Sequence, residues 1–239
     1  MTPAYPSPAA GSAPWQRFLR DQGRAMGLDI SAEQAGQLGR HAAELERWNQ
    51  KINLTAITDP FEAAVKHFLD SLAPVQWIPA GAMLLDIGSG GGFPGLPLKI
   101  HRPDLPITLV EATGKKVSFL TQVIRLLELD GIQALHGRAE APEDFPGLPG
   151  ACDVVICRAL AALDKFVVLA HPFLRPGGRL IAMKQENPDR EIADLDRLTF
   201  ERRGREVPAT NLFSVQIRDY RLPWSGDRRS LVILDLPRR

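Results

Sequence analysis

Apolar positions recur at helical spacing through the first third of the chain. This pattern predicts helices over residues 15–26, 31–50 and 59–73. Ser31 and Gln34 fit the capping box that opens the second of these helices. The amino-terminal part of the chain is therefore predicted to be helical.

After residue 83 the pattern changes to short apolar runs separated by helical segments, which is typical of a parallel sheet with crossover helices. The fold class is therefore predicted to be α/β. The clearest helix, over residues 114–129, gathers its apolar residues on one face. The last two runs have no helix between them, so we expect them to pair antiparallel at the sheet edge. The predicted strands cover residues 83–87, 107–112, 132–136, 153–158 and 179–184, followed by 212–220 and 230–236.

These patterns divide the chain into three parts. Residues 1–14 are rich in Pro, Ala and Ser and lack an apolar period, so we expect a disordered arm. Residues 15–80 form the predicted helical cap, and residues 81–239 form the predicted α/β domain. With 239 residues, 44% of them hydrophobic, the chain can bury the core of one domain of ordinary size.

Composition excludes some classes of protein. No apolar run approaches the roughly 20 residues that span a bilayer, and a secretory signal is missing, so we expect a cytoplasmic protein without membrane contacts. Cys152 and Cys157 lie in one apolar segment, CDVVIC, at a spacing that puts them on opposite faces of a strand and excludes a disulfide between them. The net charge is +1, but residues 197–239 hold ten arginines against five acids. This excess fits a polyanionic partner as well as a solvated surface.

The stretch LLDIGSGGGFPG, residues 84–95, is predicted to be a strand followed by a glycine-rich loop. Such loops cradle adenosine cofactors, and the spacing of Gly88, Gly90 and Gly92 fits both nicotinamide dinucleotides and S-adenosylmethionine (SAM). Glu111, at the end of the next strand, is expected to accept hydrogen bonds from both ribose hydroxyls in either case. The glycines alone leave the two cofactors open.

Two features beside the loop favour SAM. Pro94 and Pro97 remove N–H donors from the helix start, where a pyrophosphate would bind. Asp86 would place a carboxylate about 5 Å from each phosphate, which costs on the order of 3 kcal/mol per charge. SAM has no phosphate and carries positive charge, so SAM is the expected cofactor and a dinucleotide is the alternative.

Five longer stretches carry a more specific signal. Together, over roughly Trp15 to Leu236, they resemble the GidB/RsmG family of bacterial methyltransferases, which modify guanine N7 in 16S ribosomal RNA. The resemblance implies a Rossmann-like SAM-dependent methyltransferase fold, with a parallel sheet closed by an antiparallel last strand. The stretches are WNQKINLT (48–55), VKHFLDSL (65–72), LLDIGSGGGFPGLPL (84–98), GKKVSFL (114–120) and VVICRALAAL (154–163).

The resemblance also implies where the cofactor binds. The chain departs from the family at Cys157, where the family has serine, and at Gln185, where glycine is typical. Neither departure touches the glycine loop. The implied SAM contacts are Gly88, Phe93, Ala139, Glu140 and Arg158, with Glu111 at the place of the family's ribose-binding acid.

Methylation of guanine N7 needs no general base, because N7 already bears a lone pair. Catalysis would rest on holding N7 in line with the methyl group and on excluding water. Arg158 is the candidate positioning residue, through guanine O6, a phosphate or the carboxylate of SAM. His67, Asp70 and Ser71 share one face of a predicted helix. We expect these three to dock the cap onto the sheet or onto a phosphate, or else to have only a surface or capping role.

The RNA is expected to present its target guanine unpaired. N7 lies in the deep groove of an RNA helix, which side chains cannot enter, so the target should lie in a loop, bulge or splayed junction. Phe93 and Trp224 are candidates to stack on the base, although core packing would also account for each aromatic. Lys184, at the end of the fifth predicted strand, is a candidate to meet an RNA phosphate or else faces water.

The sequence thus predicts a SAM-dependent 16S ribosomal RNA (guanine-N7)-methyltransferase that acts as a monomer, without a metal, on the small ribosomal subunit or its precursor. Two alternatives stay open, a nicotinamide-linked oxidoreductase and a non-catalytic SAM-binding module on the ribosome. A cytosine-C5 methyltransferase would need Cys157 as its nucleophile, and no proline precedes this cysteine as that chemistry would lead us to expect.

Overall fold

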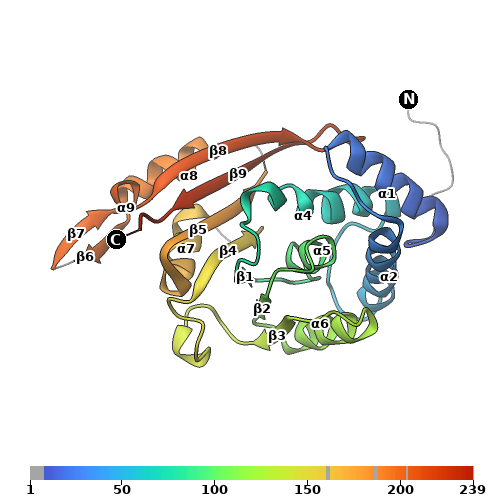
Figure 1. Cartoon of the computed structure of the whole chain (residues 1–239), viewed down its shortest axis with the longest axis horizontal. Coiled ribbons are helices and arrows are strands. Elements are labelled where there is room, and N and C mark those ends of the chain that lie inside the picture. Colours follow the sequence, from blue (N-terminus) through green and yellow to red (C-terminus); the bar gives the residue numbers. More distant parts are fainter. Residues whose placement is uncertain (1–7, 160–161, 186–187, 203, 239) are drawn as a thin grey trace.

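The strands predicted after residue 83 assemble into one seven-stranded sheet (Figure 1). The computed structural model describes residues 8–159, 162–185, 188–202 and 204–238. Strands β1 to β5 run parallel in the order β3-β2-β1-β4-β5, β9 pairs antiparallel with β5, and β8 closes the edge antiparallel to β9. The predicted α/β class and the antiparallel edge are confirmed. The strands are β1 (Leu84–Ile87), β2 (Ile107–Glu111), β3 (Ile132–His136), β4 (Cys152–Arg158), β5 (Leu174–Lys184), β8 (Ser214–Arg221) and β9 (Arg228–Asp235).

The second cap helix begins as its sequence predicts. In α2 (Ala32–Asn49), the Ser31 hydroxyl accepts a hydrogen bond from Gln34 N at 3.1 Å, and Gln34 Oε1 accepts one from Ser31 N at 3.0 Å. This reciprocal pair satisfies two of the N–H groups that a helix start leaves unpaired. The capping box is therefore confirmed.

The first cap helix starts earlier than predicted. α1 (Ala13–Ala25) takes Pro14 into its first turn, where the missing N–H of proline costs nothing. Before it, Gly11 O accepts a hydrogen bond from Gln16 Nε2 at 2.9 Å. The arm expected over residues 1–14 thus overlaps α1, and its first seven residues lie outside the described part of the chain.

The third cap segment contains a turn that the periodicity does not predict. Asp59 Oδ1 accepts a hydrogen bond from Glu62 N at 2.8 Å and caps the segment. The helix then widens into a π-helical turn, a feature that often lies at functional sites, and this turn carries His67. In order, the segment consists of α3 (Pro60–Ala63), the π-helical turn η1 (Ala64–Leu69) and α4 (Asp70–Leu72).

The remaining helices connect the strands and cover both faces of the sheet (Figure 1). The helix predicted over 114–129 is α6, and the others were not predicted from the pattern. A short hairpin of β6 and β7 stands apart from the main sheet. These elements are η2 (Val75–Trp77), α5 (Gly95–His101), α6 (Gly114–Leu126), η3 (Pro142–Asp144), α7 (Leu163–Ala170), η4 (His171–Phe173), α8 (Asp189–Asp194), η5 (Leu195–Arg197), β6 (Thr199–Arg202), β7 (Arg205–Pro208) and α9 (Ala209–Leu212).

Two hydrophobic clusters lie on the two faces of the sheet. Along β4, Val154 and Ile156 pack in the cluster under the cap, whereas Val155 packs in the other, as strand alternation requires. Cys152 and Cys157 both pack in this second cluster, so the prediction that they face opposite sides is wrong. The register of β4 against β5 shifts just after Cys152, which moves that residue to the other face. Both cysteines are free and buried.

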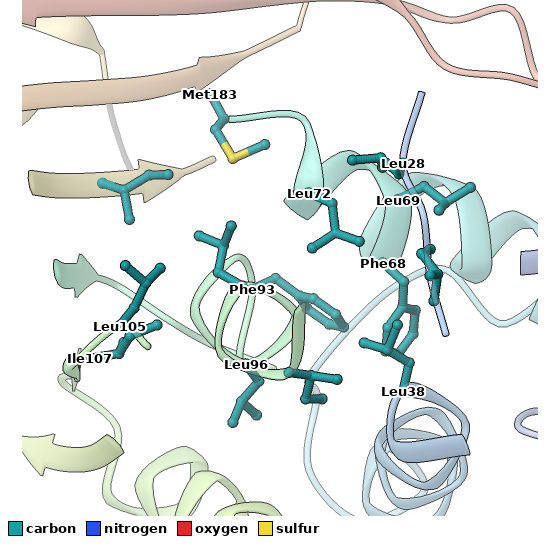
Figure 2. Close-up of a cluster of buried hydrophobic side chains, with 14 of the residues drawn as sticks. Leu28, Leu38, Phe68, Leu69, Leu72, Phe93, Leu96, Leu105, Ile107 and Met183 are labelled. Carbon is teal, nitrogen blue, oxygen red and sulfur yellow. The ribbon is translucent and has the colours of Figure 1, made fainter. Parts of the chain in front are cut away.

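The cap has no core of its own. The cluster on its side joins Trp15 and Phe68 of the cap to Leu84 and Ile107 of the sheet. Phe93, from the glycine loop, reaches into the space between them (Figure 2). We therefore propose that residues 15–80 act as a lid fixed onto the 81–239 domain through a shared core. Within the described residues, none of the helices has the length and apolar character needed to cross a bilayer.

Candidate active site

The glycine-rich loop after β1 is held by backbone hydrogen bonds. Gly88 N donates to Val110 O at 2.8 Å, and Gly90 N donates to Glu111 Oε2 at 3.0 Å. A Cβ at Gly95 would clash with Leu109, whereas one at Gly90 would meet only Gly88 O, at 3.8 Å. Gly95 is thus required by packing, and the side of the loop above Gly90 is open. The φ of +54° at Gly90 also favours glycine.

Asp86 lies beneath this loop and does not face a cofactor. Its side chain is fully buried, and Oδ2 accepts a hydrogen bond from Gly95 N at 2.9 Å. Burial raises the pKa of the Asp86 carboxyl to about 7, against the lowering effect of that hydrogen bond. The expected repulsion between a charged Asp86 and a pyrophosphate is therefore not supported by this geometry. The carboxyl instead ties β1 to the start of α5.

Two histidines of the cap stack on the ring of Phe93. The His41 ring stacks on it at 5.0 Å between centroids with a 22° interplanar angle, and the His67 ring does so at 4.8 Å and 20°. Phe68 meets the same ring edge-on at 5.1 Å. With only 5% of Phe93 exposed, no base can stack on it. Of the two alternatives for Phe93, core packing is confirmed and base stacking is wrong, and the ring joins the loop to the cap.

The His41 side chain also bonds to the backbone of the glycine-rich loop. Its Nε2 lies 2.9 Å from Gly91 O, which makes Nε2 the protonated nitrogen, while Nδ1 is buried without a partner among the described residues. Complete burial lowers the pKa of His41 to about 4. The ring is therefore neutral at physiological pH, which is the only form that can sit in this apolar place without a counter-ion.

Arg158, at the end of β4, bonds to the π-helical turn of the cap. Its Nη1 donates to Lys66 O at 2.6 Å and lies 3.4 Å from Asp70 Oδ2, and its Nη2 donates to His67 Nδ1 at 3.0 Å. Because His67 Nδ1 accepts, Nε2 carries the proton and donates to Thr55 Oγ1 at 2.6 Å. Burial and the Arg158 charge lower the pKa of His67 to about 3. His67 is thus a fixed neutral hydrogen-bonding group.

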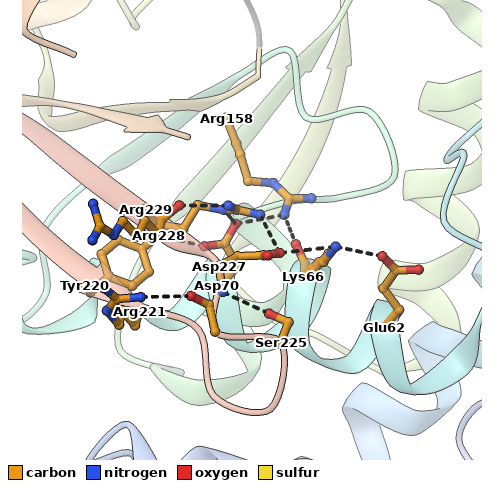
Figure 3. Close-up of polar contacts among 11 residues, drawn as sticks. Glu62, Lys66, Asp70, Arg158, Tyr220, Arg221, Ser225, Asp227, Arg228 and Arg229 are labelled. Carbon is orange, nitrogen blue, oxygen red and sulfur yellow. Dashed lines mark hydrogen bonds and ion pairs between the residues drawn. The ribbon is translucent and has the colours of Figure 1, made fainter. Parts of the chain in front are cut away.

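Asp70 extends the same contacts to the last hairpin of the sheet (Figure 3). Its Oδ1 accepts from the Tyr220 hydroxyl at 2.6 Å, and Arg229 Nε lies 4.0 Å from Oδ2. Burial and the Asp70 carboxylate raise the pKa of Tyr220. Asp227, in the loop of the hairpin, lies 3.5 Å from Arg229 and 3.1 Å from Lys66. Charges of both signs, the most buried of them on Asp70, therefore join β4, the cap and the hairpin.

A cavity of about 830 Å³ opens between the glycine loop, the π-helical turn and the ends of β4 and β5. This volume is in the range of small-molecule and cofactor sites. It lies at the carboxyl ends of parallel strands, where α/β sheets bind ligands. Of the residues predicted for the site, it is lined by Gly88, Phe93, His67, Asp70, Arg158 and Lys184.

Four predicted residues lie elsewhere. Glu111 adjoins the cavity through Gly90, and each of its carboxylate oxygens accepts one backbone N–H, from Gly90 and from Thr113. Ala139 is 6% exposed and packs in the second cluster, and Glu140 lines a separate hollow beside α7. The Ser71 hydroxyl donates to His67 O within its own helix, so Ser71 has a structural role.

Contacts bear on two further predictions. Lys184 does not face water, because its Nζ forms an ion pair with Glu191 Oε2 at 2.6 Å and 12% of its side chain is exposed, whereas its contact with an RNA phosphate stays a prediction. Cys157 is 2% exposed, and burial raises the pKa of its thiol, so it lacks the properties of a nucleophile. Within the described residues, His, Cys, Asp and Glu side chains form no cluster suited to a metal ion.

Several residues of the site are not evident from the sequence. His41 looks like an ordinary member of the apolar stripe of α2, and Tyr220 and Arg229 are separated from Asp70 by about 150 residues of chain. Thr55 lies in the stretch WNQKINLT, which resembles the family but does not indicate a role for Thr55. Only the fold brings these side chains to Arg158.

The comparisons with known proteins agree with this geometry. The GidB family model, described as rRNA small subunit methyltransferase G, matches residues 34–215. The ribosomal RNA small subunit methyltransferase G of Myxococcus xanthus is 43% identical over 210 residues, 88% of this chain and 92% of that protein. The protein of the same name from Chloroflexus aggregans is 46% identical over 183 residues, 76% of this chain and 77% of that protein.

Solved structures resemble the fold at low sequence identity. M. jannaschii TYW2 in complex with AdoMet aligns with a TM-score of 0.56 at 15% identity, covering 80% of each chain. A SAM dependent methyltransferase from Aquifex aeolicus aligns with a TM-score of 0.50 at 14% identity, covering 73% of this chain and 93% of that one. The predicted Rossmann-like methyltransferase fold is confirmed. By the match over most of its length, the chain belongs to the GidB family, the rRNA small subunit methyltransferases G.

Proposed function

We propose that this protein transfers the methyl group of SAM to N7 of one guanine in 16S ribosomal RNA. Membership of the GidB family supports the enzyme class, the cofactor and the ribosomal RNA substrate. Specificity for N7 is supported by the chemistry of the cavity. We further propose that the enzyme acts in the cytoplasm as a monomer, on the small subunit or its precursor.

The residues around the glycine loop fit SAM. The open side of the loop at Gly90 leaves backbone groups accessible from the cavity. Each Glu111 oxygen accepts one N–H and keeps a lone pair, which suits the two hydroxyls of a ribose. We propose cofactor contacts at Gly88, Phe93 and Arg158, which line the cavity, and at Glu111, which adjoins it. Contacts at Ala139 and Glu140, which lie outside the cavity, rest on the family resemblance alone. When bound there, SAM supplies an electrophilic methyl group on a sulfonium.

The N7 assignment depends on one observation: every described side chain in the cavity lining that could act as a base already has a hydrogen-bond or ion-pair partner. His67 accepts from Arg158 and donates to Thr55, and Glu62 pairs with Lys66. Asp70 and Glu191 are held in the same way, by Tyr220 with Arg158 and by Lys184 with the N–H of Leu163. Each candidate base is thus already hydrogen-bonded or ion-paired within the protein, and methylation of guanine N7 needs no base.

Arg158 is a positioning residue in this proposal. Its contacts to Lys66 O, Asp70 and His67 fix the cap over the cavity mouth, and its guanidinium lies 5.0 Å from the centre of the Phe93 ring. Among the described residues these contacts engage three of its five N–H groups, so others are available to guanine O6 or to the carboxylate of SAM. Holding the cap closed would also exclude water from the reacting atoms.

The test is methyl transfer from labelled SAM to small ribosomal subunits purified from cells that lack this gene. The wild-type protein should label one guanine, and chemical cleavage at N7-methylguanine should map to it. Arg158→Ala should lose about 100-fold in rate, because the reacting atoms would be misplaced, whereas Arg125→Ala, on the exposed side of α6, should not change the rate. Label on another atom, or SAM binding without transfer to any RNA, would overturn the proposal and favour a non-catalytic module.

A further inference from the structure

One carboxylate in the lining of the glycine-loop cavity is held through one oxygen only. Glu191 Oε2 accepts hydrogen bonds from Leu163 N, at the start of α7, and from Lys184 Nζ, at the end of β5, both at 2.6 Å. Among the described residues, no donor bonds to Glu191 Oε1. The side chain lines the cavity and is 36% exposed. Two separate elements therefore fix this carboxylate, while Oε1 is left for a ligand.

A second glutamate of the described cavity lining is held less firmly. Glu62 also pairs with a lysine, Lys66, at 2.7 Å, and its side chain is 37% exposed. These two residues are one helical turn apart, and exposed pairs at this spacing restrain their side chains only weakly. A group that is already in place binds a ligand with a smaller loss of freedom. Glu191 is thus the better prepared acceptor, and Glu62 is its natural comparison.

The sheet sets the order of the groups along the cavity. β4 lies between β1 and β5, and all three run parallel (Figure 1). Neighbouring strands are about 4.8 Å apart, so the end of β5 is about 10 Å from the end of β1. The glycine loop follows β1, Arg158 ends β4, and Lys184, which holds Glu191, ends β5. The cofactor loop, a cation and a carboxylate therefore follow one another along this edge.

Guanine carries its polar groups in a matching order. The acceptors N7 and O6 come first, followed by the donors N1–H and the N2 amino group. With N7 toward the glycine loop, O6 would lie beside Arg158 and the two donors would point toward the β5 side. Each group of the base would then face a partner of the opposite kind. Adenine has an amino group in place of O6 and a lone pair on N1, so both contacts would be lost.

We propose that Glu191 Oε1 accepts hydrogen bonds from N1–H and the N2 amino group of the target guanine, and so selects and orients the base. This inference rests on the proposed function, because it concerns the base that receives the methyl group.

The same contact favours the transfer itself. The N7 lone pair forms the bond to the methyl carbon, the carbon–sulfur bond breaks with its electron pair going to sulfur, and the N1 proton stays on guanine. The base becomes a cation in this step, so its N1–H becomes a stronger donor to the carboxylate. A contact that is stronger in the transition state than in the bound substrate lowers the barrier.

The experiment compares guanosine with inosine, which lacks the N2 amino group, as the target nucleoside. Small subunits are reconstituted with 16S ribosomal RNA that carries either nucleoside at the guanine mapped by labelling, and kcat/KM for methyl transfer is measured. The wild-type protein should prefer guanosine about tenfold, because inosine loses one hydrogen bond to a charged group.

Glu191→Gln should remove this preference. Its amide oxygen stays with the donors Leu163 N and Lys184 Nζ, which turns the NH₂ group toward the donors of guanine. The value with guanosine should fall on the order of 100-fold, and guanosine and inosine should react equally. The matched control is Glu62→Gln, which removes the same charge from the same cavity and should keep the tenfold ratio.

The ratio separates recognition of the base from a structural role. If Glu191→Gln lowered both values but kept the tenfold ratio, the carboxylate would only support the fold, and the inference would be overturned. Loss of the ratio in Glu62→Gln as well would overturn the assignment to Glu191. Equal values for guanosine and inosine in the wild type would overturn the contact to N2 and leave the proposed function intact. If the wild type labelled no guanine even in subunits purified from cells, the proposed function itself would fail.

Discussion

The two faces of the central sheet are buried by different chemistry. Under the cap, His41 and Asp86 are fully buried and Asp70 is 5% exposed, among large aromatic and aliphatic side chains. On the opposite face, which packs against α7 and α9, the cluster consists of apolar side chains and of the thiols of Cys152 and Cys157, and the buried polar residues that strand alternation places there, Thr108 and Ser230, are uncharged. The sheet therefore has buried ionisable groups under the cap and a largely apolar interior on the other side.

The difference shows on which face of the sheet function requires buried polar groups, which lower stability when they are unpaired. A buried polar group destabilises the protein unless it is paired, and the groups under the cap depend on partners from distant parts of the chain. Arg158 of β4, for example, needs Asp70 and His67 of the cap. The apolar face has no such requirement. We therefore expect the face under the cap to be sensitive to single substitutions and to pH, and the other face to be tolerant.

The largest effect on stability should come from Arg158→Met. It leaves Asp70, with a side chain 6% exposed, without one of its cationic partners, and breaking a buried pair in this way costs about 3 kcal/mol. Arg175→Met is the control, because Arg175 also pairs with an aspartate but its side chain is 52% exposed, so about 0–1 kcal/mol is expected. Urea unfolding measures both. Equal costs for the two variants would show that the Arg158 pair is not energetically special.

Acid should destabilise the face under the cap through its histidines. The pKa of His41 is lowered to about 4 in the folded protein, from about 6.5 when unfolded. Between these values the unfolded chain binds a proton that the folded protein does not, so stability is full above pH 6.5 and falls as pH decreases, by about 1.4 kcal/mol per unit. His41→Gln keeps an N–H donor for Gly91 O but does not titrate. As pH decreases, the unfolding free energy of His41→Gln should fall less steeply than that of the wild type, and the difference in slope should equal the contribution of His41. If the two proteins lost stability in parallel, the titration could not be assigned to His41.

Asp86 should act in the opposite direction. Its pKa is raised from 3.8 to about 7, so between these values the folded protein binds the extra proton, and this group contributes more stability as pH falls. In Asp86→Asn the contribution is absent. The stability of the variant relative to wild type should therefore increase as pH rises from 4 to 7, by about 1.4 kcal/mol per unit. Urea unfolding at pH 4.5 and 6.5 measures the difference in unfolding free energy between the variant and the wild type. If this difference were the same at both pH values, Asp86 would titrate outside this range.

Much of the fold follows from local pattern, and much of the site does not. The capping box at Ser31 and the alternating runs of the sheet act through neighbouring residues, so periodicity predicts them. The π-helical turn depends on contacts from far along the chain, since Lys66 O accepts a hydrogen bond from Arg158, 92 residues away. A shift in the register of β4 against β5 places Cys152 on the opposite face of the sheet from the one that simple strand alternation predicts. These features depend on tertiary contacts that one sequence does not display.

The candidate site shows the same division. The motif pattern predicted Gly88, Arg158 and the face shared by His67 and Asp70, and the structure places all four at one cavity. It did not predict that the rings of His41 and His67 would both stack on Phe93, because His41 approaches from another helix. A motif identifies which residue types a site contains, whereas the partners of each residue follow from packing.

The smallest effect should come from Cys157→Ser, on the apolar face. The substitution introduces the residue that the family resemblance leads us to expect, in a site where the side chain is 2% exposed among hydrocarbon. A buried hydroxyl without an assured partner costs about 1 kcal/mol, and the methylation rate should be unchanged because the thiol, with its pKa raised by burial, takes no part in the chemistry. Thermal unfolding and methyl transfer to small subunits measure the two effects separately. A lost rate with an intact fold would show that the second face also contributes to the reaction, and the contrast between the faces would then concern stability alone.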